Sequence, residues 1–506
     1  MFIRKKKNKS GSVSVQLISK SSGKYKLVKT IGSSSDEQQI CILIEKGKQE
    51  IQRIENQNGL FVFEKDALIE SFVSELENAQ IRTVGPEMVF GKIYDYIGYN
   101  TIDNHLFRHL VIARLAFPLS KLKTIEYLYR YQGIRLDLDG VYRFLDKLNK
   151  ELKTKVEHIS FEHTKRVLNN NISIVFYDMT TLYFEASDKD DLRKTGFSKD
   201  GKHSNPQIFL GLLVGLGGYA IGYDIFEGNI FEGHTLIPMI EKISSKFNLS
   251  KPIVVADAGL LSKDNILNLE AKDYQYILGA RIKNESQKIK DQILASTLKN
   301  EEYLVLEKGG TKIIVQHSDK RAKKDEHNRN RGLQRLEKQI KSGKLTKQNI
   351  NNRGYNKYLQ MEGELKVTID KEKFENDKKW DGLKGYVTNC VLTPKEITDN
   401  YKNLWHIEKA FRMSKTDLRI RPIYHRLRHR IEAHICLSFV AYSIYKELER
   451  VLAKEKFELS VEKATEITHN IYQMQITLPE SRHNKNVLLK TDINQSELLR
   501  IIENNF

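Results

Sequence analysis

A series of apolar runs between residues 172 and 280 limits the possible folds more than any other feature of the sequence. ISIVFYDMTTLYFE, from Ile172, is rich in β-branched and aromatic residues and predicts a long strand. QIFLGLLVGL and YAIGYDIFEG flank a glycine pair and predict a hairpin, because glycine supplies the positive φ of a tight turn. PIVVAD and YQYILGA predict two more strands, and helices are expected at residues 234–246 and 262–268. This order predicts a mixed α/β sheet flanked by helices.

Three carboxylates stand in surroundings where an unpaired charge is costly. Asp178 lies inside the first predicted strand, and Asp257 ends PIVVAD, a position where ligands bind in open α/β sheets. Glu408 lies among cations and aromatic residues in YKNLWHIEKAFRMSK. A single acid of this kind is more typical of a cap or a salt bridge. Three of them, with no Cys or His ligand set beside them, favour oxygen-only coordination of Mg²⁺ or Mn²⁺.

The segment around Glu408 is predicted to be one continuous helix. It begins at TPKE, a capping box with proline at the first helical position. On such a helix Tyr401, Glu408, Arg412 and Lys415 share one stripe. The alternative is an ordinary amphipathic helix with a solvated charged face. Trp405 is expected in the core, with stacking on an unpaired base as the alternative role.

The charge of the chain indicates a polyanionic partner. The 506 residues include 83 Lys and Arg against 65 Asp and Glu, a net charge of +18, which suits nucleic acid or an anionic membrane surface. The excess is concentrated at residues 318–358, with 13 basic against 4 acidic residues, and at residues 401–430, with 9 against 2. No run of 18 consecutive apolar residues occurs, so no membrane span is predicted and a nucleic-acid partner is favoured.

The carboxylates and the cations together suit chemistry on a phosphodiester. Breaking or joining this bond needs an activated oxygen nucleophile and a stabilised leaving oxygen. Two metal ions roughly 4 Å apart, held by carboxylates from separate elements, provide both. Surrounding cations then hold the nucleic-acid backbone. The residues therefore predict a metal-dependent enzyme that acts on nucleic acid.

The region from about residue 170 to 445 resembles the DDE transposases of bacterial insertion sequences, which have a ribonuclease-H-like catalytic core. YDMTT resembles the family segment with the first aspartate, VVADAG the segment with the second, and GNIFEGHT a segment between them. The long insertion between Asp257 and Glu408 also resembles the family. The family signature Tyr-(2)-Arg-(3)-Glu-(6)-Lys is matched in spacing, with leucine in place of arginine, by Tyr401, Leu404, Glu408 and Lys415.

The resemblance implies that Asp178, Asp257 and Glu408 are the catalytic residues and hold two Mg²⁺ or Mn²⁺ ions. It implies a ribonuclease-H-like mixed sheet flanked by helices, interrupted by a basic α+β insertion and preceded by a small β segment and a helical DNA-binding region. The expected activity is cleavage at the terminal inverted repeats of a mobile element and transfer of the 3′-OH ends to target DNA, by a homodimer. Two alternatives remain: a metal-dependent nuclease or resolvase without strand transfer, and a catalytically inactive DNA-binding protein.

Residues along and after the Glu408 helix are predicted to contact DNA. They are Tyr401, Lys409, Arg412, Lys415, Arg421, His425 and Arg428. Arg412 or Lys409 could supply the charge that is missing at Leu404. The spacing of His425 and His429 also permits metal ligation, but no fourth ligand is evident, so a basic DNA-facing turn is favoured. Lys199 and Lys202 are further candidates for phosphate contact.

Changes of pattern along the chain predict six segments. They are 1–85, a basic β/α segment; 86–170, helical and DNA-binding; 171–283, the first part of the catalytic core; 284–392, the insertion domain; 393–450, the second part of the core; and 451–506, the tail. DGVYRFLDKL is predicted to be the second helix of a helix-turn-helix capped by Asp139, or else part of a bundle that packs on the next domain. The scattered Cys41, Cys390 and Cys436 fit a reducing cytoplasm.

Overall fold

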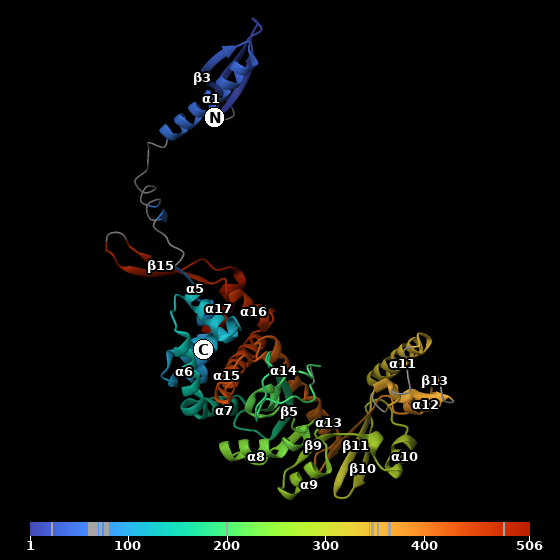
Figure 1. Ribbon diagram of the computed structural model, residues 1–506. Helices are drawn as coiled ribbons and strands as arrows, with labels where there is room; N and C mark the ends of the chain where they lie inside the picture. Colours follow the sequence, from blue (N-terminus) through green and yellow to red (C-terminus); the bar gives the residue numbers. More distant parts are fainter. Residues whose placement is uncertain are drawn as a thin grey trace. The chain divides into compact units, whose positions relative to one another are not determined.

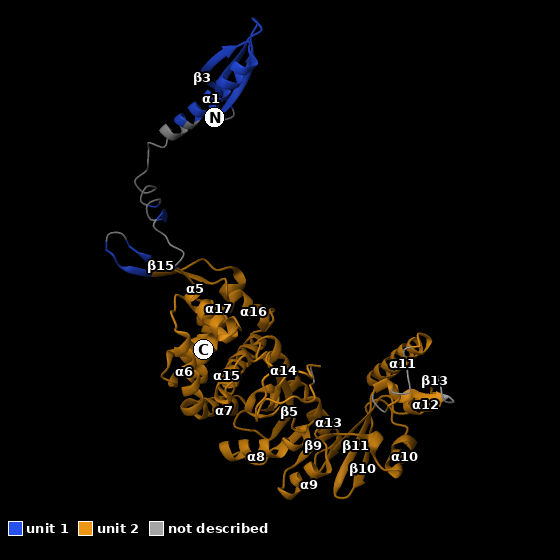
Figure 2. Ribbon diagram, viewed as in Figure 1, with its two compact units in different colours: residues 1–80, 475–485 blue, residues 81–474, 486–506 orange. Residues whose placement is uncertain are grey.

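The computed structural model groups the chain into two compact units (Figure 2). One comprises residues 1–80 with 475–485, and the other residues 81–474 with 486–506. The finer division into six segments stays a prediction. Lys199 lies outside the described residues. The structure describes residues 1–21, 24–58, 69, 73–74, 80–198, 201–343, 345, 349–351, 354–362, 366–478 and 481–506.

The first unit contains an antiparallel sheet in the order β1-β2-β3, followed by a long helix. The elements are β1 (Phe2–Lys7), β2 (Val13–Ser21), β3 (Lys24–Ser34) and α1 (Glu37–Asn58). The central strand β2 buries Val15, Leu17 and Ile18, and α1 contacts both β2 and β3. The predicted N-terminal β segment is confirmed, with the apolar residues of β2 buried between two basic strands and α1.

Residues 86–170 of the second unit are mainly helical, as predicted. The α-helices are α3 (Lys92–Ile97), α4 (His105–Ala116), α5 (Lys121–Gln132), α6 (Leu138–Lys147) and α7 (Lys153–Val167). In Figure 1 these helices gather around α15 (Arg428–Lys454), whose apolar middle is almost entirely buried. A helix that is apolar all round needs such a surrounding bundle.

Helix α6 begins two residues earlier than predicted. The Asp137 side chain, not that of Asp139, caps it by accepting a hydrogen bond from the Gly140 N–H at 2.7 Å. Asp137 has the extended backbone that a cap requires, while Asp139 lies in the first helical turn. Val141 and Phe144 on α6 join the core that contains α15, as the bundle alternative describes. Recognition of DNA by α6 stays a prediction.

The predicted mixed sheet is confirmed and has eight strands in the order β10-β11-β14-β9-β8-β5-β6-β7. Strands β5, β6 and β7 form an antiparallel meander, and β8 and β9 run parallel to β5. This arrangement is the ribonuclease-H-like core. The core strands are β5 (Ile174–Tyr183), β6 (Gln207–Val214), β7 (Ala220–Glu227), β8 (Ile253–Ala256) and β9 (Tyr276–Ala280).

Helices cover both faces of the sheet (Figure 1). On one face Tyr177 and Ala256 pack in a cluster with residues of α8 (Leu236–Phe247) and α9 (Lys263–Ala271). On the other face Phe176 and Val255 pack in the cluster that contains residues of α13 (Pro394–Lys402), α14 (Trp405–Thr416) and α15. The alternation of buried residues between two clusters explains why these strands are apolar on both sides.

The insertion adds strands to the same sheet. β10 (Tyr303–Lys308), β11 (Thr311–His317) and β14 (Leu383–Thr388) extend it beyond β9 in antiparallel pairing. The chain between β11 and β14 forms a lobe with its own small hydrophobic core, which includes Leu336 and Tyr358. The remaining insertion elements are α10 (Gln287–Ala295), α11 (Asp319–Lys341), β12 (Leu359–Glu362), β13 (Lys366–Ile369) and α12 (Lys371–Lys378).

The predicted continuous helix from the capping box to Lys415 is wrong. The chain forms α13 (Pro394–Lys402) and α14 (Trp405–Thr416), with a break at Asn403 and Leu404. Around the break the N–H groups of Asn403, Leu404 and His406 bond to carbonyls three residues earlier, which tightens the turn. The capping box of α13 is confirmed at Thr393 and Glu396.

The tail of the chain returns to secondary structure. It forms β15, which pairs with the short strand β4, and helices that pack near α15. The elements are β4 (Ile81–Thr83), α16 (Val461–Thr468), β15 (Tyr472–Thr477), β16 (Asn484–Leu488) and α17 (Ile493–Asn505). Within the described ranges, none of the helices has the length and apolar content that crossing a membrane demands.

Candidate active site

Asp178 and Asp257 lie side by side on neighbouring parallel strands. Tyr177 of β5 pairs with Ala256 of β8, so each aspartate follows directly after a paired residue. Adjacent strands are about 4.8 Å apart, and paired residues point to the same face. Both aspartates are half-buried and belong to the face covered by α13 and α14, because Phe176 and Val255 point there. The sheet therefore presents two carboxylates from separate elements at one point.

Hydrogen bonds orient both carboxylates. Oδ1 of Asp178 accepts from the Met179 N–H at 2.7 Å. Oδ1 of Asp257 accepts from the Gly259 N–H at 2.8 Å and from the Leu260 N–H at 3.3 Å. The two bonds to Asp257 engage one of its oxygens beyond the end of β8.

Glu408 lies in the first turn of α14, which packs on β5 and β6 on this same face. The carboxylate is exposed, whereas Ile407 and Phe411 on the other side of the helix are buried in the core. The amphipathic pattern of α14 thus fixes which side of the helix turns to the sheet and leaves Glu408 at its solvent edge.

Tyr401 links the two acids. Its ring packs edge to face on Tyr386 of β14, with ring centroids 4.8 Å apart. Burial raises the pKa of the Tyr401 phenol, and the carboxylates of Asp257 and Glu408 raise it further, so both acids lie within electrostatic reach of this hydroxyl. The Tyr401 hydroxyl therefore lies near both Asp257, which follows β8, and Glu408 of α14.

Gly279 makes room for this tyrosine, and the sequence reasoning missed it. Gly279 follows the residue of β9 that pairs with Ala256, which brings it beside Asp257, and it pairs with Tyr386 on its other side. A Cβ atom at Gly279 would lie 2.5 Å from the Tyr401 hydroxyl oxygen and 2.9 Å from the backbone nitrogen of Ala258. A lone glycine in the apolar strand YILGA was the available signal, since such a glycine often marks a close approach.

Two cations from the insertion stand next to Tyr401, and the sequence reasoning missed these too. The ammonium of Lys384 on β14 lies 4.4 Å from the centre of the Tyr401 ring. Burial lowers the pKa of Lys384 and the Arg321 guanidinium lowers it further, while the Glu408 carboxylate opposes this effect. Arg321 lies in the first turn of α11 and pairs with Asp325 at 3.3 Å. Only the fold of the insertion brings these two charges to the carboxylates.

The donor set fits a hard divalent cation, although the three side chains do not form a closed cluster. Asp178, Asp257 and Glu408 offer carboxylate oxygens alone, which are the ligands that Mg²⁺ and Mn²⁺ prefer. Across the described stretches of the chain, no three Asp, Glu, His or Cys side chains stand close enough to hold a metal together. The two aspartates thus lie together on adjacent strands, whereas Glu408 is exposed on α14.

The predicted DNA contacts occupy three different surroundings. Arg412 is exposed one turn after Glu408, and Lys415 is half-buried further along α14. Lys409 forms an ion pair with Glu449 of α15, which holds it against the bundle. Arg421, His425 and Arg428 lie beyond α14, at or near the start of α15.

Arg421 and His425 line a cavity, whereas Arg428 is exposed and pairs with Glu432 at 3.2 Å. The His429 ring pairs with the Asp146 carboxylate at 2.9 Å. His425 instead faces His434, with ring centroids 5.5 Å apart. The structure therefore does not bring the spaced histidines together as metal ligands within the part of the chain that it describes.

Two side chains of the signature segment differ from expectation. Trp405, predicted in the core, is 48% exposed, because the break before α14 turns the first residue of that helix outward. Leu404 stands at the break and is 7% exposed, packed in the core. An apolar side chain therefore fills the position where the family signature has arginine, and the nearby charge comes from elsewhere.

Comparison with known protein families identifies the family of this chain. The family model described as "Transposase DDE domain" matches residues 169–444, which is more than half of the 506-residue chain. This range contains Asp178, Asp257 and Glu408. No curated protein sequence matches the chain.

Solved structures of transposases are among those similar to this chain. A cryo-EM structure of the piggyBac transposase synaptic complex with hairpin DNA has 9% sequence identity and a TM-score of 0.38, covering 76% of this chain and 78% of that one. The Mos1 transposase paired-end complex with left transposon end has 12% identity and a TM-score of 0.16, covering 33% of this chain and 56% of that one. These TM-scores are too low to carry an argument, so the assignment rests on the match of the family model. The chain belongs to the family of transposases with a DDE domain.

Proposed function

We propose that this transposase binds the ends of its own mobile element, cuts the phosphodiester bonds there and joins the freed 3′-OH ends to target DNA. The observation that carries the proposal is the pairing of β5 with β8. It puts Asp178 and Asp257 side by side on the face where α14 carries Glu408. Acids from two strands and a helix, surrounded by cations, suit a reaction at a phosphate.

Asp178, Asp257 and Glu408 would hold two Mg²⁺ or Mn²⁺ ions. When bound, the ions supply activation of the attacking oxygen and stabilisation of the leaving oxygen. Glu408 would complete the set of ligands, because its helix packs on β5, the strand that carries Asp178.

The reaction proceeds in two substitutions at phosphorus. Water attacks first, its oxygen forms the new bond to phosphorus, and the 3′ oxygen of the element end leaves as a hydroxyl. That 3′-OH then attacks a phosphodiester of the target strand, whose own 3′ oxygen leaves. No covalent bond between protein and DNA is required in either step.

Cations beside the carboxylates hold the DNA end. Arg412 and Lys415 follow Glu408 on α14, and Lys384 with Arg321 approaches from the insertion. Lys384 takes the electrostatic place of the arginine that the signature lacks at Leu404. The Lys384 ammonium lies over the rings of both Tyr386 and Tyr401, which positions the charge. Holding two ends at once requires a homodimer.

The test uses purified protein, Mg²⁺ and a duplex that carries the inverted repeat flanking the gene. The expected products are a cut at the repeat and a joined strand on a second, labelled target duplex. Cuts that never lead to joined strands would favour the metal-dependent nuclease or resolvase. Binding without any cut, with Mg²⁺ or Mn²⁺, would favour the catalytically inactive DNA-binding protein.

A further inference from the structure

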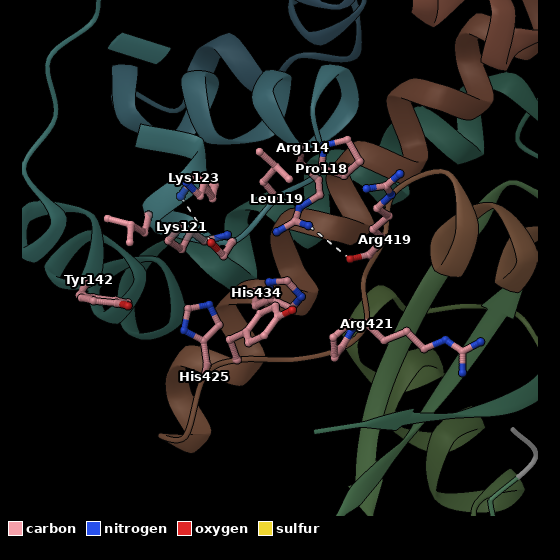
Figure 3. A pocket seen from close by; sticks show the side chains of 14 residues that line it. Arg114, Pro118, Leu119, Lys121, Lys123, Tyr142, Arg419, Arg421, His425 and His434 are labelled. Carbon is pink, nitrogen blue, oxygen red and sulfur yellow. Dashed lines mark hydrogen bonds between the residues drawn. The ribbon is translucent and has the colours of Figure 1, made fainter. Parts of the chain in front are cut away.

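A cavity of about 610 Å³ lies between the helical region and the segment that follows α14 (Figure 3). α4 and the start of α5 form one wall, and residues 419–425 with α15 form the other. The basic and imidazole side chains on its walls include Arg114, Lys121, Arg419, Arg421, His425 and His434. None of the residues that line it is an aspartate or a glutamate.

Two of these cations are buried without an acidic partner. Arg114 is 5% exposed and Lys121 is 6% exposed, and neither forms an ion pair with a carboxylate of the described chain. Arg114 donates only long bonds, 3.4 Å each, to the carbonyl oxygens of Leu418 and Arg419. A buried cation without counter-charge is costly, so such a pair is kept where an anion binds.

The imidazoles repeat this pattern. Nε2 of His434 bonds to the Ile420 carbonyl oxygen at 2.9 Å, while its buried Nδ1 has no hydrogen-bond partner among the described residues. Burial lowers the pKa of His425 to about 3, and the charges of Lys121 and Arg114 contribute to this shift. Burial and then Arg114 lower the pKa of Lys121. Burial and neighbouring positive charge thus disfavour the charged forms of Lys121 and His425, and a bound anion would offset this effect.

The start of α5 adds donors to the same wall. Ser120 caps this helix of 12 residues, and Lys121 and Leu122 begin it on the cavity wall. Free N–H groups at a helix start favour phosphate. The cavity has a volume typical of small-ligand pockets, which accommodates a phosphate with its attached sugar.

The cavity is connected to the catalytic sheet. The Ile423 N–H donates to the carbonyl oxygen of Tyr183 at 3.2 Å, and the Arg421 guanidinium lies 5.6 Å from the centre of the Tyr183 ring. Tyr183 ends β5, five residues after Asp178. At the rise of a strand this is roughly 17 Å along β5. A DNA strand that passes the carboxylates is therefore within a few nucleotides of the cavity.

We propose that this cavity binds one backbone phosphate of the DNA, held by Arg114, Lys121 and the start of α5. The assignment of the phosphate to DNA rests on the proposed function. The proposal that the cavity binds a phosphate group is independent of that function.

The first experiment measures thermal unfolding of the full chain in inorganic phosphate and in chloride at equal ionic strength. Phosphate is expected to raise the melting temperature of the unaltered protein. Lys121→Met should melt higher than the unaltered protein in chloride, because a buried unpaired charge is gone, and should lose the phosphate response. Lys121→Arg should keep the response. Lys147→Met removes a charge from an exposed position of α6 and is the matched control, with the response unchanged.

A Lys121→Met protein that melts lower in chloride and still responds fully to phosphate would overturn the proposal. The second experiment assigns the source of the phosphate with a duplex of random sequence. Lys121→Met should weaken binding and reduce the slope of log K against log salt by about 1. A lost phosphate response with unchanged DNA affinity would overturn the assignment to DNA and point to free phosphate.

Both readouts are independent of DNA cleavage. A protein that never cuts DNA, yet responds to phosphate through Lys121, would refute the proposed DNA cleavage. The proposal that the cavity binds phosphate would still hold. A protein that cuts and joins DNA without the phosphate response would refute the pocket alone.

Discussion

Substitution of Gly279 by alanine tests the placement of Tyr401 beside Asp257. The added Cβ would meet the Tyr401 hydroxyl oxygen at 2.5 Å and the Ala258 nitrogen at 2.9 Å. Carbon needs about 3.5 Å for a normal contact, so the tyrosine must retreat by about 1 Å, since the Ala258 nitrogen belongs to the backbone. The retreat is opposed by the Tyr386 ring, whose centroid is 4.8 Å away.

Overpacking of this kind costs about 1–3 kcal/mol of folding free energy. A displacement of about 1 Å near the reacting groups reduces the rate by about 10²-fold. We expect Gly279→Ala to show both effects, in urea unfolding and in single-turnover cleavage of end DNA. Gly140→Ala on α6 is the control, because its Cβ meets no atom closer than 3.3 Å.

The double variant Gly279→Ala/Tyr401→Phe sharpens the test. Loss of the hydroxyl removes the closest contact, so the double variant should recover part of the lost stability, with a coupling of about 0.5–3 kcal/mol in the cycle. Strictly additive effects of the two substitutions, or no loss of stability in Gly279→Ala, would refute the placement of Tyr401 against β9.

Three further predictions concern substitutions of Lys384, Arg450 and Trp405. Lys384→Met should weaken binding of end DNA and lower its salt slope by about 1, without loss of stability in thermal unfolding, because burial already lowers the pKa of this ammonium. Arg450→Met should cost about 3 kcal/mol in urea unfolding, since it leaves the fully buried Glu447 with His163 as its one ion-pair partner among the described residues. Burial by itself raises the pKa of Glu447, but His163 and Arg450 bring it below its usual value, so this carboxylate stabilises the fold above the pKa of the unfolded chain. That contribution is lost as the pH falls through the folded-state pKa. The free energy of unfolding should therefore fall more steeply with decreasing pH in the unaltered protein than in Arg450→Met. Trp405→Ala should change stability by no more than about 0.5 kcal/mol, because the side chain is half exposed, yet weaken DNA binding by about 1–3 kcal/mol if a base stacks on it, as gel shift would show.

Local patterns predicted the parts of the fold that depend on neighbours in sequence. The hairpin around Gly217, the cap at Ser262 and the capping box at Thr393 are all present. The strand PIVVAD is buried on both faces, as its unbroken apolar run indicates. The two aspartates were found because a carboxylate among apolar strand residues is unusual.

Contacts distant in sequence explain what could not be predicted. Tyr303–Lys308 and Leu383–Thr388 are recognisable as strands, but nothing local shows that they extend the catalytic sheet through β11. Only that pairing brings Lys384 to Tyr401. Helical spacing also could not show the break at Leu404. Asn403 and Leu404 keep helical backbone angles, and only their hydrogen bonds change, to carbonyls three residues earlier in the chain.

The buried cations of the cavity were hidden for the same reason. Lys121 reads as a surface lysine at the start of an amphipathic helix, and its burial depends on the segment around His425, some 300 residues later. His425 was selected for its basic surroundings in sequence, whereas the structure shows it buried beside other positive groups. Sequence distance concealed a cluster that the fold assembles.

The most direct measurement of the central claim compares end cleavage by the unaltered protein with that of Asp178→Asn, Asp257→Asn and Glu408→Gln. Each change removes one carboxylate charge and preserves the shape of the side chain. In Mg²⁺, the account predicts a loss of at least about 10³-fold in the single-turnover rate for each variant, or about 4 kcal/mol, with the affinity for end DNA retained. A variant that binds end DNA and cuts it at the unaltered rate would contradict the assignment of its carboxylate to the catalytic site.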